Sequence, residues 1–111
     1  MRSRYAAFAL GLGEYLVQTL AATHPDREQP RDELVRDLAR ARARQRFLGL
    51  RIVSASASGD AGEVLFFARI FEQGKDRSFA ERSTFVHEDG GWRYHAGVLV
   101  PKTELPPAIV D

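Results

Sequence analysis

The chain has 111 residues, 44% of them hydrophobic, which is enough for one domain with a core of ordinary size. Sixteen Lys and Arg against fifteen Asp and Glu leave a formal charge of +1, so no strong overall field attracts nucleic acid or an acidic membrane. Cysteine is absent, which excludes disulfides, a thiol nucleophile and cysteine-bound zinc.

The first twenty residues predict two short helices. Their apolar residues recur at steps of three and four, as on one face of a helix: Tyr5, Phe8, Leu12, Tyr15, Leu16 and Leu20. Gly11 and Gly13 interrupt this pattern, and a glycine inside a helix costs about 1 kcal/mol relative to alanine. We therefore expect a bend between the two helices at these glycines.

The same segment has some features of an export signal, because Arg2 and Arg4 precede an apolar run. Glu14 ends that run early, so we expect the segment to belong to the folded domain and the protein to be cytoplasmic. No stretch approaches the roughly 20 apolar residues of a membrane span.

A third helix is expected to start near Pro30, whose fixed backbone angle suits a first helical turn. Leu34, Val35 and Leu38 would form its buried face. Arginines at four-residue spacing follow the other side: Arg36, Arg40 and Arg44. Such a row can meet phosphates, but no aromatic residues lie between the arginines, and we interpret it as a solvated face without a nucleic-acid partner.

From residue 47 the apolar period changes to two, and four strands are expected, at 47–54, 63–71, 77–87 and 92–100. Short stretches with turn composition separate them. Helices followed by consecutive antiparallel strands predict an α+β fold in which the helices cover one face of the sheet. We expect one domain over residues 1–100 and an extended proline-rich tail over residues 101–111.

Two hairpin turns predict which residues pair. Asp89-Gly90 is a favoured type I′ turn and would place Phe85 opposite Tyr94 and Ser83 opposite Ala96. A turn at Gly74-Lys75 would place Ala68 opposite Glu81. Both registers direct the same set of side chains toward the helices: Val64, Phe66, Ala68, Ile70, Phe79, Glu81, Ser83, Phe85, Trp92, Tyr94, Ala96 and Val98.

Glu81 is the unusual member of this set, because it lies between two phenylalanines on the core side of its strand. Its predicted neighbours Ala68, Ser83 and Ala96 are small and leave room for a helix side chain, water or a ligand. A buried carboxylate without a partner costs several kcal/mol, so Glu81 should be paired, hydrogen-bonded or protonated. Arg4 or Arg2 from the first helix is the expected partner, with Tyr5 also within reach.

The chain also resembles a known family. The segments MRSRYAAF (1–8), FLGL (47–50), FFAR (66–69), ERSTF (81–85) and GGWRYHAG (90–97) are similar, in order, to the middle domain of the YchJ family. The resemblance implies an NTF2-like, or cystatin-like, fold in which a curved sheet wraps helices and encloses a pocket. The family has no assigned reaction that the resemblance could transfer.

Two features depart from the family pattern. The resemblance implies cysteine-rich SEC-C zinc motifs at one or both ends, and this chain has none; it is either a trimmed piece or from a lineage that lacks them. Zinc binding and an association with SecB or ribosomes therefore do not transfer. Ala96 stands where the family pattern has aspartate, so a role for that aspartate does not transfer either.

We interpret the chain as a binding or accessory domain without enzymatic activity, with a small apolar molecule as a candidate ligand between helices and sheet. The candidate ligand-binding residues are Glu81, Ser83, Tyr94, Trp92, Phe66, Tyr5 and Arg4. The alternative is an isomerase, dehydratase or hydrolase in which Glu81 is the general acid or base and Tyr94 or Tyr5 the donor.

Other sites and partners follow from the same registers. The outer face of the sheet would carry Leu65, Phe67 and Phe71, which could form a homodimer unless the C-terminal tail covers them with Leu105, Ile109 and Val110. His87 is expected inside, His95 outside and His24 in a loop, so we expect no metal site and no cofactor. Ser83 has no base predicted beside it, which argues against a serine nucleophile.

Overall fold

The computed structural model describes residues 1–110, without the side chains of Ala41 and Val110. The helical half consists of α1 (Arg2–Leu10), α2 (Gly13–Gln18), the 3-10 helix η1 (Pro25–Glu28), α3 (Arg31–Ala39) and α4 (Ala41–Arg44). The strands are β1 (Gln45–Ser58), β2 (Ala61–Glu72), β3 (Lys75–Asp76), β4 (Phe79–Glu88) and β5 (Gly91–Val100). Two short helices, η2 (Lys102–Glu104) and α5 (Pro107–Val110), follow the sheet.

The bend predicted at the two N-terminal glycines is confirmed. Gly11 ends α1 in the left-handed region at φ 70°, which glycine adopts without a steric penalty. Gly13 begins α2 so close to α3 that a Cβ placed on it would overlap the carbonyl oxygen of Val35. The first two helices therefore pack as separate short rods.

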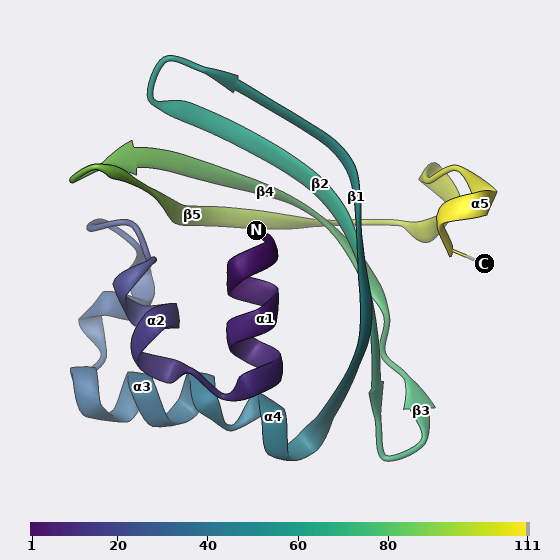
Figure 1. Ribbon diagram of the computed structural model, residues 1–111, viewed down its shortest axis with the longest axis horizontal. Helices are drawn as coiled ribbons and strands as arrows, with labels where there is room; N and C mark the ends of the chain where they lie inside the picture. The colour runs from purple at the N-terminus through teal and green to yellow at the C-terminus, as the bar shows by residue number, and fades with distance from the viewer. Residues whose placement is uncertain (111) are drawn as a thin grey trace.

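The strands form one curved antiparallel sheet in the order β1-β2-β4-β5, and the short β3 pairs with β2. Helices α1 to α4 lie on its concave side, with α1 inside the arch, whereas α5 lies on the other side of the sheet (Figure 1). The predicted α+β architecture of helices on a curved antiparallel sheet is confirmed. Four long strands match the predicted ones, and β3 is an addition at the tip of a hairpin.

The hairpin between β2 and β4 has a different register from the predicted one. Gln73 and Gly74 both have positive φ angles, 53° and 75°, so the turn lies one residue earlier than expected. Phe66 is therefore opposite Glu81, and Ala68 is opposite Phe79. Because this shift moves the pairing by two residues, every side chain keeps its predicted face.

The hairpin between β4 and β5 begins as predicted. Asp89 and Gly90 have φ angles of 50° and 78°, as a type I′ turn requires, and Phe85 pairs with Tyr94. The register then shifts after Tyr94, so Ser83 is opposite Gly97 and not opposite Ala96. The predicted inward positions of Ala96 and Val98 are wrong because this bulge adds a residue to β5.

The C-terminal segment is folded and not extended. Leu105 is 5% exposed and packs with Phe67 and Ala80 on the outer face of the sheet, and Ile109 packs against the same cluster. Of the predicted covering residues, the side chain of Val110 lies outside the described part of the chain, as does Asp111. Apolar burial beneath the segment explains why it turns back.

Among the described residues, no helix is both long and apolar enough to cross a membrane.

Candidate functional site

Glu81 lies on the concave face of β4 and is held by two hydroxyl groups. The Tyr94 hydroxyl donates a hydrogen bond of 3.1 Å to Glu81 Oε2, and Ser83 Oγ donates to the same oxygen. Ser83 is fully buried, whereas Glu81 is partly exposed. The predicted need for a partner is therefore met from the sheet itself and not from the first helix.

Gly97 makes this contact possible. It lies opposite Ser83 on β5, and a Cβ at this position would overlap both Glu81 Cδ and the Tyr94 hydroxyl. The bulge after Tyr94 brings a glycine to this point where an unbroken register would place alanine. A close approach of two side chains over a strand is a recognised use of glycine.

Arg4 is buried next to this pair but does not form the expected ion pair with Glu81. Its Nη1 donates to the Leu16 carbonyl oxygen at 2.9 Å and to Thr19 Oγ1. Its guanidinium carbon lies 4.9 Å from the centre of the Tyr94 ring, in cation–π geometry. Burial lowers the pKa of Arg4, and the nearby Tyr94 and Glu81 oppose that change. Arg2 is exposed.

Tyr94 is fixed at both backbone and ring. Its N–H donates to Thr19 O at 2.6 Å, and its carbonyl accepts from the Ala21 N–H at 2.8 Å, so the segment after α2 adds a parallel bridge to the edge of β5. Burial, with the charge and hydrogen bond of Glu81, raises the pKa of Tyr94 to about 12. The hydroxyl therefore stays protonated at neutral pH.

A cavity of about 220 Å³ lies between the helices and the sheet, and we call it the inner cavity. Its polar side chains are Arg4, His24, Asp26, Glu81 and Tyr94. Its apolar lining includes six side chains from helix and strand: Tyr5, Phe8, Phe47, Phe66, Phe79 and Ile70. A mostly apolar space with a few convergent polar groups is typical of small-molecule sites.

The inner cavity brings together five of the seven candidate residues: Glu81, Tyr94, Phe66, Tyr5 and Arg4. Tyr5 accepts a hydrogen bond of 2.8 Å from the Gly49 N–H, and burial raises its pKa. Ser83 lies behind Glu81 and does not line the cavity. Trp92 lines a different hollow nearer the β1–β2 hairpin, because it is two residues before Tyr94 on the same strand.

His24, which is expected only in a loop, also lines the inner cavity. Its ring lies 5.7 Å from that of Tyr94, and its Nδ1 accepts from the Asp26 N–H at 3.1 Å, which assigns the proton of the neutral ring to Nε2. Burial lowers its pKa. In the sequence, the one sign that His24 has a structural role is its position just before Pro25, where the 3-10 helix η1 starts. This position does not predict a contact with β5.

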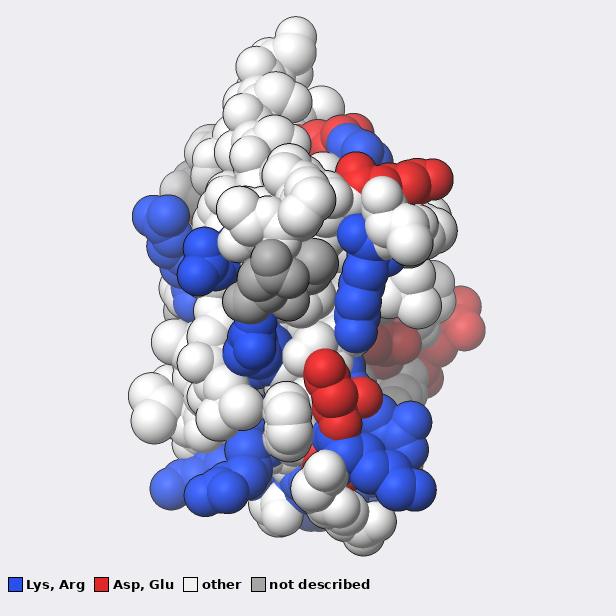
Figure 2. All heavy atoms as spheres, turned by 90° about the vertical axis from the view of Figure 1, so that its right-hand side faces the viewer, with Lys and Arg blue, Asp and Glu red and all other residues white. Residues whose placement is uncertain are grey.

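The outer, convex face of the sheet is different in character. Lys and Arg side chains are scattered over it among uncharged surface (Figure 2). Arg82 forms an ion pair of 2.6 Å with Glu63, and Phe67 lies beneath Leu105. Within the described residues no group of three His, Asp or Glu side chains is placed to hold a metal ion.

Comparisons with known proteins agree with this architecture. Residues 1–97 match the family model for the YchJ middle NTF2-like domain. A UPF0225 protein from Chromobacterium violaceum is 36% identical over 102 residues, which cover 89% of this chain and 70% of that relative. The solution structure of a SEC-C motif-containing protein from Rhodopseudomonas palustris is 39% identical, with a TM-score of 0.74, over 91% of this chain and 76% of that one.

The matched residues include α1, the sheet up to Gly97 and therefore the whole Glu81–Tyr94 pair. The identity of both relatives exceeds the level at which only a fold is shared. The chain belongs to the YchJ family, and residues 1–97 form the NTF2-like domain that is the middle domain of that family.

Proposed function

We propose that the domain binds a small, mostly apolar molecule in the inner cavity and recognises a hydrogen-bond donor on it through Glu81. The observation that supports this most is the Glu81–Tyr94 contact over Gly97, which directs a carboxylate toward an aromatic space. Tyr94 and Ser83 both donate to Oε2, and in the described part of the chain no hydrogen bond to Oε1 is found, which leaves that oxygen for a ligand hydroxyl or amine.

A matched pair of probes tests this proposal. Para-ethylphenol carries a hydroxyl where para-ethylanisole carries a methoxy group, so only the phenol can donate a hydrogen bond, and amide NMR titration gives their affinities. A hydrogen bond to a charged acceptor contributes about 1.5–3 kcal/mol, so we expect the phenol to bind about tenfold more tightly or better. Glu81→Gln should lose most of this preference.

The matched control is Glu33→Gln, which removes an exposed carboxylate of α3. It should keep the preference of the unaltered protein. Equal affinities for the two probes, or a preference that survives Glu81→Gln unchanged, would refute the role of Glu81.

Proton transfer is a second candidate function, in an isomerase, dehydratase or hydrolase. It is favoured by the presence of a carboxylate and a protonated phenol, Glu81 and Tyr94, on one cavity wall. Glu81 would take a proton from carbon after the Tyr94 hydroxyl turns from Glu81 Oε2 to donate its one hydrogen bond to the substrate oxygen. Exchange of the α-protons of cyclohexanone with deuterated water should then exceed the buffer rate and disappear in Glu81→Gln. Equal rates for the two proteins would exclude this chemistry.

A further inference from the structure

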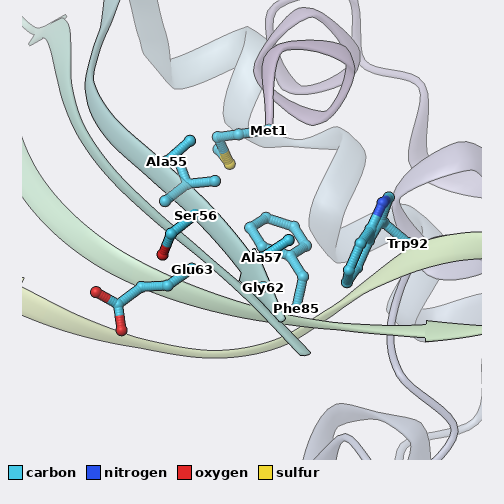
Figure 3. A pocket seen from close by; sticks show the side chains of 9 residues that line it. Met1, Ala55, Ser56, Ala57, Gly62, Glu63, Phe85 and Trp92 are labelled. Atoms are coloured by element: carbon cyan, nitrogen blue, oxygen red, sulfur yellow. The ribbon is translucent and has the colours of Figure 1, made fainter. Parts of the chain in front are cut away.

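A second hollow of about 380 Å³ lies at the N-terminal end of α1, beside the β1–β2 hairpin. We call it the Trp92 hollow. Its walls are Trp92 and Phe85 on one side and Met1 and Ala55 on the other, with Ala57 and Gly62 along the strands (Figure 3). It is therefore formed by different strand positions from those around Glu81.

The Trp92 hollow offers almost no polar anchor. Among the described lining residues Glu63 has the one charged side chain, and this carboxylate points away from Trp92 and Phe85 (Figure 3). Glu63 is also held by Arg82 at 2.6 Å. A cavity with such walls favours an apolar chain, and a charged group would lose hydration there without gaining a partner.

Trp92 is held in place although it is 43% exposed. The indole lies against the strand at Gly62, where a Cβ would be 3.2 Å from Trp92 Cζ3. The indole also meets the His87 ring edge-on, at 5.2 Å between ring centres. A large aromatic surface fixed on one side and open on the other is a suitable wall for an apolar ligand.

Met1 lines both the Trp92 hollow and the inner cavity. In the core it packs against the cluster of Phe66, Ala68 and Ile70. Methionine is unbranched and changes rotamer easily, so its side chain can move aside without a change in the backbone. The two spaces are thus neighbours with one adaptable side chain in both linings.

We propose that the ligand is an elongated amphipathic molecule. Its hydrogen-bond donor lies at Glu81 in the inner cavity, and its apolar chain passes Met1 and covers Trp92. This inference rests on the proposed function, because it needs the donor end to bind at Glu81. It adds that chain length, and not only the polar group, determines affinity.

A series of straight-chain alcohols from butanol to decanol, with the hydroxyl at one end, tests this. Each buried methylene should tighten binding about fourfold, and the increase should continue through the long members. Trp92 is the one tryptophan of the chain, so its fluorescence reports the hollow directly. We expect its emission to move to shorter wavelength with the long alcohols and not with butanol.

Two variants separate the chain site from the donor site. Ala55→Phe fills the Trp92 hollow and should remove the gain from the long chains while butanol binding, followed at the Gly97 amide, is unchanged. Ser54→Phe is the control, because Ser54 is opposite Leu65 and does not line the hollow. It should bind every alcohol as the unaltered protein does.

The outcomes distinguish the two proposals. If butanol binds but affinity stops rising at intermediate length and Trp92 emission does not move, the elongated ligand is wrong and the inner site stands. A long-chain gain that survives Ala55→Phe also overturns the inference. If no alcohol binds, the proposed function fails and this inference fails with it.

Discussion

At the level of single residues, the sequence allowed Glu81 to be identified but not its partners. The alternation of side chains along β4 correctly predicts that this carboxylate faces the helices. The expected partner, Arg4, instead donates to Leu16 and Thr19, and its guanidinium lies over the Tyr94 ring. Tyr94 replaces it because the bulge brings glycine over the carboxylate, and a bulge has no clear sequence signal.

At the level of elements, turn chemistry determined how much of the sheet could be predicted. The Asp89-Gly90 turn has a strong local preference and was placed correctly, whereas the Gln73-Gly74 turn was placed one residue late. The residues predicted to face inward are still correct up to Tyr94, because burial constrains which side of the sheet a side chain faces more strongly than which residue it pairs with. Beyond Tyr94 the prediction failed at the bulge.

The C-terminal segment is the element whose contacts matter most for the outer face. Leu105 covers Phe67, so the homodimer predicted through Leu65, Phe67 and Phe71 would have to displace this segment or use the part of the face near Phe71. The dimer stays a prediction. Its contact surface would be more accessible in a variant that loosens the segment.

Replacing Leu105 by alanine tests this packing. The change should lower the free energy of unfolding by about 2–4 kcal/mol, since a buried leucine loses both apolar burial and close contacts. Leu99→Ala is the matched control and should cost far less, because Leu99 is 70% exposed. Urea unfolding measures both, and light scattering on the same samples shows whether Leu105→Ala increases dimer formation. Equal stabilities of the two variants would contradict the position of the segment.

At the level of the whole molecule, the order of helices before strands was sufficient to predict the layers, and the family resemblance added the curvature of the sheet. Of the small residues expected around Glu81, Ala68 lines the inner cavity, whereas Ser83 does not and Ala96 faces outward after the bulge. The contact of His24 with Tyr94 could not be predicted from the sequence, because it joins a loop to a strand about seventy residues later. The Trp92 hollow depends in the same way on contacts between α1, β1 and β5.

The candidate site depends most directly on the hydrogen bond between Tyr94 and Glu81, and a pH titration of the tyrosines tests this bond without a ligand. The pKa of Tyr94 is raised from 10.0 to about 12, so the folded state holds this proton more tightly than the unfolded state. The corresponding stability is complete below pH 10.0 and is lost as the pH rises through about 12.

Rapid pH jumps, followed by the ultraviolet absorbance of tyrosinate, read ionisation before the chain unfolds. Tyr94→Phe should remove the component that ionises near pH 12. Glu81→Gln should move that component to lower pH, because it removes the charge and the charged acceptor but leaves the burial of the ring. If Glu81→Gln and the unaltered protein give the same tyrosine titration, the Glu81–Tyr94 pair is not present in solution.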